Sequence, residues 1–309
     1  MSISLYPYQL SLTQPLVFAQ QMIGQRQGFF VQINDAWGEI APPLTADMAL
    51  VAKDARQACA RLRQGLAHNA HTPAVQFGLD CALAQLPSAP FSLKTSPLNL
   101  PLLEGARDPL VRAWRCRRIH PALAWLTLTG SIHYDAGLIR ELCLLAPKVR
   151  LVLDGAGQFS DEYIQDLWSR IDGQRIDWIM DAGTTLAQAQ GLAEQANIPV
   201  ALDIARYLDT PPPQQVDLGA FSFASALLIR PSQLGGLAYN QALVRHAQQL
   251  GQAVLLGDSL QSGFGQSQLA YLSGQWLGEA PLALGRCRYL LDSGVDHHGL
   301  PLISGLTPL

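Results

Sequence analysis

Three aspartates each follow directly on a short apolar run of strand length. They are Asp154 after Val149–Leu153, Asp181 after Ile176–Met180, and Asp203 after Val200–Leu202. If these runs are successive parallel strands, their carboxylates meet at the C-terminal edge, where barrel proteins place their active sites. Three converging oxygen ligands suit a hard divalent cation, Mg2+ before Zn2+. The pattern therefore predicts a metal site made of these three aspartates.

A second interpretation of the same aspartates is structural. Aspartate is common at the start of helices, because its side chain accepts hydrogen bonds from free backbone N–H groups. Each of the three could therefore cap the helix that follows its strand. The repetition in three consecutive units favours the metal site over three independent caps.

Two later runs add polar groups to the same edge. Ala226–Ile229 is followed by Arg230, and an arginine at the end of a buried strand needs an anionic partner. Ala253–Leu256 is followed by a glycine- and serine-rich turn that opens a helix, where backbone N–H groups can hold a carboxylate. Simple capping is the alternative here too. The predicted substrate-binding residues are Gly257, Asp258, Ser259, Gln261 and Ser262.

The elements that must position these residues begin near residue 96. From there, apolar runs alternate with amphipathic helical windows such as 135–146, 160–171 and 234–250. A further strand is expected over 124–129. Repeated units of this length predict an α/β fold with a parallel sheet covered by helices. Periodicity alone leaves a closed barrel and an open doubly wound sheet equally possible.

The first part of the chain has a different pattern. Strand-like composition over 3–10 and 28–34 is followed by helical patterns over 46–66 and 75–86. Two strands followed by two helices predict a small α+β unit ahead of the repeated units.

Composition limits the classes of function. The chain has 309 residues and a net charge of -3, with 49% hydrophobic and 15% charged residues. A mildly acidic chain without a basic run gives no reason to expect nucleic acid as a partner. No leader sequence or membrane-spanning run is recognisable, so we expect a cytoplasmic protein that does not contact a membrane. The lysines are Lys53, Lys94 and Lys148.

Several motifs, in order along nearly the whole chain, resemble those of the o-succinylbenzoate synthases of the enolase superfamily. Trp37–Ile40 resembles the family's WGEI motif in the capping domain, and Phe77–Ala84 resembles its FGxxCALA helix. The strands ending at Asp154, Asp181 and Asp203 resemble the family's metal-binding strands in spacing. The remaining matches are Ile229–Ser232, similar to the IKP segment, and Asp258–Leu269, similar to the loop and helix read as SSxESSLGLxQL.

This resemblance implies a fold and a reaction. The fold is a modified (β/α) TIM-type barrel over 96–285, with an α+β capping domain over 1–95 and a C-terminal segment, 286–309, that returns to the cap. The reaction is the Mg2+-assisted dehydration of a hydroxycyclohexadiene carboxylate in menaquinone biosynthesis, which makes the protein a lyase. The expected partner is a small-molecule carboxylate substrate, and the expected state is a monomer or a small homo-oligomer.

The chain departs from the family at the residues that carry the chemistry. The strand that holds a K-x-K or K-x-R motif in the family reads Leu126–Gly130 here and contains no lysine. Met180 aligns with the family's glutamate ligand, and Asp181 is one residue further on. Arg230 stands at the position of the sixth-strand lysine and cannot act as a neutral base. His133 is a speculative substitute base, with a solvated loop histidine as the alternative.

These departures leave several hypotheses. The first is an o-succinylbenzoate synthase-like lyase that works with an atypical site. The second is a catalytically degenerate homologue that binds a small carboxylate or a protein partner. The third is another reaction at an α-carbon, such as racemisation or sugar-acid dehydration. An unrelated doubly wound protein is the last.

Overall fold

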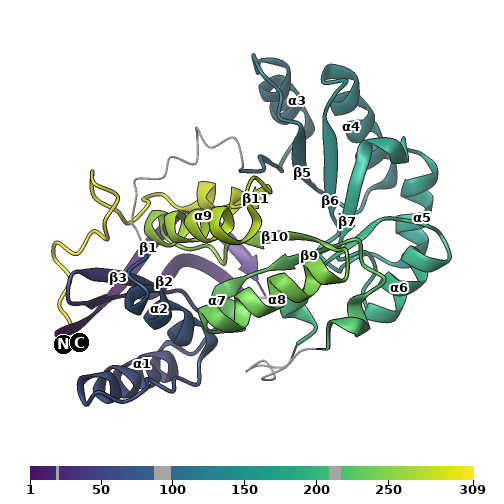
Figure 1. The fold of residues 1–309 in the computed structure, drawn as a ribbon. Coiled ribbons are helices and arrows are strands. Elements are labelled where there is room, and N and C mark those ends of the chain that lie inside the picture. Colours follow the sequence, from purple (N-terminus) through teal and green to yellow (C-terminus); the bar gives the residue numbers. More distant parts are fainter. Residues whose placement is uncertain (19–20, 87–98, 209–216) are drawn as a thin grey trace.

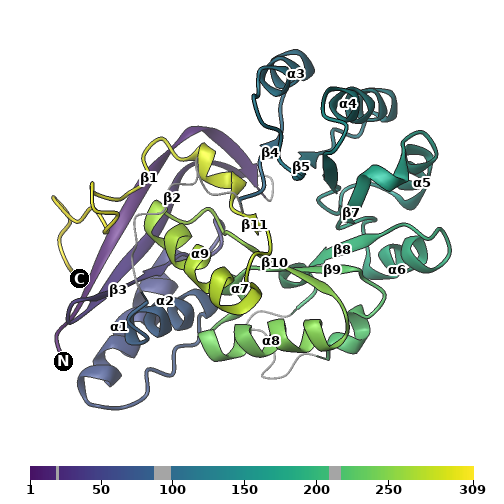
Figure 2. The same ribbon diagram turned by 45° about the horizontal axis from the view of Figure 1, so that its top comes forward.

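The structure is a computed structural model that describes residues 1–18, 21–86, 99–208 and 217–309. An N-terminal antiparallel sheet with two helices lies beside a parallel sheet whose outer face is covered by helices (Figure 1). The two chain ends lie close together on the side of the antiparallel sheet (Figure 2). Within the described residues, no helix combines the length and the apolar character that a membrane span requires.

The antiparallel sheet consists of β1 (Ile3–Phe18), β2 (Gln21–Ile33) and β3 (Ala36–Ile40). One face packs against α1 (Met48–Arg63) and α2 (Pro73–Leu83), which confirms that strands precede two helices here. Asp47 caps α1 by accepting hydrogen bonds from two backbone N–H groups, and a proline begins α2, where its missing N–H costs nothing.

Two glycines let β3 lie directly on α2. A Cβ atom at Gly38 would lie 1.9 Å from the carbonyl oxygen of Gly78, and one at Gly78 would lie 2.7 Å from the carbonyl oxygen of Glu39. Neither position can hold a side chain without moving backbone. This close contact fixes the position of Glu39, which follows Gly38 in β3.

The parallel sheet follows the chain in strict order. Its strands are β4 (Leu102–Leu103), β5 (Leu123–Thr127), β6 (Arg150–Asp154), β7 (Ile176–Met180), β8 (Val200–Asp203), β9 (Ala226–Ile229), β10 (Ala253–Gly257) and β11 (Leu282–Ala283). The two edges meet at a parallel bridge between Asn99 and Leu282, where the Leu100 amide donates to the Leu282 carbonyl at 2.8 Å. Sequential order without a reversal excludes the doubly wound alternative and confirms the α/β barrel.

Helices connect the strands and cover the outside of the sheet (Figure 1). They are α3 (Arg107–Arg115), α4 (Ile132–Leu145), α5 (Asp161–Ser169), α6 (Leu186–Glu194), α7 (Pro231–Leu234), α8 (Leu237–Gln249) and α9 (Gly263–Leu277). Short 3-10 turns are η1 (Gly173–Arg175), η2 (Ile204–Arg206), η3 (Leu218–Phe221) and η4 (Gly285–Tyr289).

Alternate residues of the barrel strands face two different cores. Leu151, Leu153 and Leu202 belong to the large core between the sheet and the helices. Their neighbours Val152 and Ala201 belong to a smaller core inside the barrel, together with Trp125, Met180, Leu228 and Leu255. The two-residue period of a strand therefore decides which residues at the C-terminal ends point into the barrel mouth.

A buried carboxylate fastens the N-terminal sheet to the barrel. Glu39, which is 1% exposed, accepts hydrogen bonds from the Ser262 amide at 2.9 Å and from the Ser262 hydroxyl at 2.7 Å. The Tyr8 hydroxyl donates to the same carboxylate. The C-terminal segment also contacts β1, because the Leu309 amide donates to the Leu5 carbonyl at 2.8 Å. The expected domain limits stay a prediction, and the one between residues 95 and 96 lies outside the described residues.

The Glu39 contact gives a stability prediction. Replacing Glu39 with glutamine keeps the side-chain volume but puts an NH2 group where a carboxylate oxygen accepts hydrogen bonds from Tyr8 and Ser262. The free energy of unfolding should therefore fall by about 3 kcal/mol. Urea and thermal denaturation would measure the loss. Glu141→Gln is the control, because it weakens only partly exposed pairs, with Arg107 and Arg115, and should cost less than about 1 kcal/mol. Equal losses in the two variants would contradict the role given to Glu39.

Candidate active site

A cavity of about 530 Å³ opens at the C-terminal ends of the barrel strands. This volume lies within the range of small-molecule sites. Its floor is formed by inward-facing apolar side chains, including Trp125, Met180 and Leu228. Its polar lining includes the three predicted metal aspartates and three arginines, Arg206, Arg230 and Arg286. This cavity is the candidate active site.

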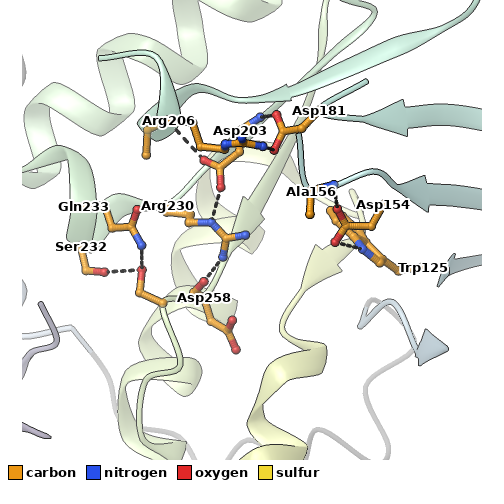
Figure 3. A network of polar contacts seen from close by, with 12 residues as sticks. Trp125, Asp154, Ala156, Asp181, Asp203, Arg206, Arg230, Ser232, Gln233 and Asp258 are labelled. Carbon is orange, nitrogen blue, oxygen red and sulfur yellow. Dashed lines mark hydrogen bonds and ion pairs between the residues drawn. The ribbon is translucent and has the colours of Figure 1, made fainter. Parts of the chain in front are cut away.

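The strand period explains how three of the charged residues reach the cavity. Val152, Ala201 and Leu228 face the inside of the barrel. Two residues further along each strand direction stand Asp154, Asp203 and Arg230, respectively. They therefore point into the same mouth, and all three line the cavity (Figure 3).

Asp181 reaches the mouth by a different route. Met180 takes the inward position at the end of β7, so a regular strand would turn Asp181 away. Instead, Asp181 has a left-handed backbone with φ of 48°, a conformation that is costly for a residue with a side chain. Its carboxylate accepts the Asp203 amide at 2.9 Å and pairs with the Arg206 guanidinium at 2.9 Å.

Asp203 and Arg230 form a buried ion pair across β8 and β9. Arg230 is 6% exposed, and its Nε donates to Asp203 Oδ2 at 2.6 Å. The Arg230 Nη1 donates to the carbonyl oxygen of Asp258. Burial acts to lower the pKa of Arg230, but the adjacent Asp203 carboxylate holds that pKa above its ordinary value. Arg230 is therefore a permanent cation.

Asp154 is held by neutral donors. Trp125 Nε1 donates to one carboxylate oxygen at 3.0 Å, and the Ala156 amide donates to the other at 2.9 Å (Figure 3). The second contact resembles the capping expected for a strand-end aspartate. Asp203 makes such a contact too, accepting from the Ala205 amide at 3.3 Å.

The predicted substrate-binding turn lies only partly at the cavity. Ser259 lines the cavity, and its hydroxyl contacts the Ser232 hydroxyl and the Gln233 amide nitrogen, each at 3.0 Å. Ser262 is turned away and is bound by Glu39, as described above. The residues Gly257, Asp258 and Gln261 are buried and are not part of the cavity lining.

Asp258 lies in an unusual environment. It is 0% exposed, and within the described residues neither carboxylate oxygen has a hydrogen-bond partner. Burial raises the pKa of Asp258, and the charges of Arg286 and Arg230 oppose this rise. The raised pKa favours the neutral acid, which relieves the cost of burying this group.

His133, the speculative substitute base, does not line the cavity. It lies in the first turn of α4 and is exposed, so it is solvated as the alternative interpretation expects, although in a helix and not in a loop. The strand for which the resemblance predicts lysines, β5, supplies Trp125 and Thr127 to the cavity. Lys53 lies in α1 and Lys148 follows α4, while Lys94 lies outside the described residues.

Sequence reasoning missed Arg206, Arg286, Glu104 and Tyr289, which all line the cavity. Arg206 stands three residues after Asp203 in the turn η2, and Arg286 and Tyr289 belong to η4. Such short turns carry no periodic pattern. The one available signal was an arginine close behind a predicted rim aspartate.

The residues present do not fit a Mg2+ ion. Each oxygen of the three aspartates already accepts a hydrogen bond, and two of these oxygens face guanidinium groups. Met180, which stands where the resemblance to o-succinylbenzoate synthases predicts a glutamate, offers a soft thioether that hard cations disfavour. In the part of the chain that the structure describes, no group of three or more His, Cys, Asp or Glu side chains is placed to hold a metal ion.

Comparisons of the sequence point to one group of enzymes. Residues 1–86 match the family described as the MenC N-terminal domain. The o-succinylbenzoate synthase of Proteus mirabilis is 26% identical over 288 residues, covering 88% of this chain and 86% of its own length. That of Yersinia enterocolitica is 24% identical over 291 residues, covering 90% of this chain and 87% of its own length. The chain thus resembles these synthases distantly.

Comparisons of the structure give the fold. The o-succinylbenzoate synthase of Thermosynechococcus elongatus, solved with Mg in its active site, has a TM-score of 0.73 at 18% identity, covering 94% of this chain and 95% of its own. The L-Ala-D/L-Glu epimerase of Bacillus subtilis has a TM-score of 0.71 at 12% identity, covering 96% and 92%. The fold is that of enolase-superfamily proteins. Similarity to such enzymes suggests an enzyme and leaves the reaction open.

Asp181 gives a prediction on pH dependence. Burial and the nearby Asp203 charge raise the pKa of Asp181 to about 6, although Arg206 opposes this rise. A raised pKa means that the folded state binds the proton more tightly than the unfolded state does. The stability from this group is therefore present below about pH 4 and lost as the pH rises through about 6, at most about 3 kcal/mol.

Denaturation of wild type and Asp181→Asn between pH 4 and 7 would test this. The variant should lose less stability over this range than wild type, whatever its absolute stability. Asp166→Asn, at a surface pair with Arg170, is the control and should keep the wild-type slope. Parallel slopes in wild type and Asp181→Asn would show that Asp181 does not titrate there.

Proposed function

We propose that the barrel mouth binds a small organic carboxylate with a ring, of the o-succinylbenzoate type, without metal-assisted removal of a proton. The observation that carries this proposal is the composition of the cavity, in which three arginines border an apolar floor. An apolar floor accepts a ring, and guanidinium groups accept a carboxylate in bidentate geometry. The distant similarity to o-succinylbenzoate synthases supports the same class of ligand.

Arg286 is the arginine most available to a ligand. Arg206 and Arg230 are paired with Asp181 and Asp203, and Glu104 at the rim is paired with Arg288. Among the described residues, no carboxylate lies within 4.0 Å of Arg286, which is exposed at the rim. An entering anion would therefore first meet a cation that has no direct ion-pair partner.

The cavity lacks the groups that the family's reaction needs. Removing a proton from carbon at neutral pH requires a positioned base and a charge sink. No lysine or histidine is part of the described cavity lining, and Arg230 cannot lose its proton. The charges present can bind and orient a carboxylate, but they do not supply a neutral base.

A second candidate is an o-succinylbenzoate synthase-like lyase with an atypical site. What favours it is similarity that extends over 88% to 90% of the chain, together with three aspartates at the strand ends. It predicts that the hydroxycyclohexadiene carboxylate is converted to the aromatic product when Mg2+ is added. We expect no turnover above a protein-free blank, and turnover would make this candidate the function.

Calorimetric titration with o-succinylbenzoate in EDTA would test the binding proposal. We expect binding with one site per chain. Arg286→Gln should weaken it about tenfold, close to 1.4 kcal/mol, because one charge-assisted contact is lost. Arg170→Gln, at the surface directly after α5, should bind like wild type. No binding by folded wild type would refute the proposed binding site. Equal affinity of Arg286→Gln and Arg170→Gln would refute the role given to Arg286.

A further inference from the structure

We propose that Arg206 and Arg230 permanently take the place of a divalent cation in the barrel mouth, which makes the site independent of metal. This inference rests on the proposed function, because it concerns the same barrel mouth that is proposed to receive the ligand. Its test uses metal ions alone, so its failure can be told apart from a failure of ligand binding. Four observations carry it.

The first observation is the set of contacts that Arg230 makes. Its guanidinium lies between two strand ends, bound to the Asp203 carboxylate on β8 and to the Asp258 carbonyl after β10. The arginine side chain is 7% exposed and that of Asp203 10%. A buried cation that holds a carboxylate and a carbonyl makes the same kinds of contact that a hard metal ion makes with oxygen ligands.

The second observation is the position of the Arg206 guanidinium and its contacts. Its Nη1 lies 2.9 Å from Asp181 Oδ2, and its guanidinium lies against the backbone of Gly157. A Cβ atom at Gly157 would lie 2.1 Å from Nη2 and 2.2 Å from Nη1. A side chain at residue 157 would therefore push the guanidinium from its present position, and the φ of 59° separately favours glycine there.

The third observation is charge balance. Asp181 and Asp203 are neighbours in the mouth, where the Asp203 amide donates to Asp181 Oδ1 at 2.9 Å. Two buried carboxylates on residues in direct contact need a cation between or beside them. Each has a guanidinium on its own oxygen, so their need for a cation is already met. A Mg2+ ion bound by both carboxylates would have to displace both arginines, and one bound by Asp181 alone would have to displace Arg206.

The fourth observation is the contact set of Asp154. Its two oxygens accept from an indole N–H and a backbone N–H, so it presents no free oxygen toward the other two carboxylates. With Met180 at the inward end of β7, the mouth offers no further oxygen from that strand. The guanidinium groups supply hydrogen-bond donors to an anion in place of Lewis acidity.

Metal binding to wild type and to the double variant Arg206→Gln, Arg230→Gln tests the proposal. Two readouts are needed: the melting temperature in millimolar MgCl2 against NaCl of equal ionic strength, and loss of the free Mn2+ signal in electron paramagnetic resonance. Wild type should show no metal-specific shift and no Mn2+ uptake. The double variant, with Asp181 and Asp203 released, should gain both.

Arg150→Gln is the matched control. It removes an arginine from another pair between adjacent strands, with Asp177, at the opposite end of β6 and β7. It should remain as insensitive to Mg2+ and Mn2+ as wild type, because it frees no carboxylate in the mouth. Uptake by Arg150→Gln equal to that of the double variant would mean surface binding and would overturn the proposal.

Two further outcomes would overturn it. One is stoichiometric Mn2+ uptake by wild type. The other is a double variant that is folded by circular dichroism yet takes up no Mn2+. If the double variant does not fold, Arg206→Gln alone and Gly157→Ala serve instead, because each releases Asp181 while Arg230 stays in place. Partial Mn2+ uptake by both supports the proposal, and uptake by neither contradicts it.

Discussion

The two-residue period of the barrel strands is the constraint on which the site depends. Because Val152, Ala201 and Leu228 must fill the inside of the barrel, the residues two positions later can only point into its mouth. Asp154, Asp203 and Arg230 are brought together in this way, although they are far apart in the chain. Asp181 is out of phase and joins them through a left-handed backbone that its contacts with Asp203 and Arg206 stabilise.

Acidic side chains grouped in a partly buried mouth repel one another and lose hydration, so their negative charge must be compensated. Carboxylates that cannot be hydrated must be neutralised by protons, by a metal ion or by basic side chains. Here basic side chains meet the demand at two of the three aspartates, and N–H donors meet it at the third. The same substitution that leaves Arg230 where relatives are expected to have lysine thus removes a base and supplies a permanent counter-ion.

Much of this arrangement could be predicted from sequence. Strands Ile176–Met180 and Ala226–Ile229 have the expected limits, and the convergence of Asp154 and Asp203 follows from parallel pairing, whereas that of Asp181 does not. The features that could not be predicted from sequence depend on contacts that leave no local pattern in the chain. The strands β4 and β11 are two residues long, Arg206 sits in a 3-10 turn, and Ser262 is taken by Glu39 from 223 residues away. Such partners become visible only when the chain is folded.

The contacts that hold the N-terminal sheet in place are separate from the charged residues of the cavity, so the fold can be kept while the cavity residues differ. Glu39 and the paired glycines Gly38 and Gly78 hold the N-terminal sheet against α2 and the barrel, and none of these contacts involves the cavity charges. Exchanging a lysine for an arginine at the mouth therefore does not disturb the enclosure that an apolar ring needs. Binding requires only that enclosure and a compensating charge, whereas catalysis also requires a neutral base. A barrel of this kind can therefore enclose a carboxylate ligand without containing a neutral base.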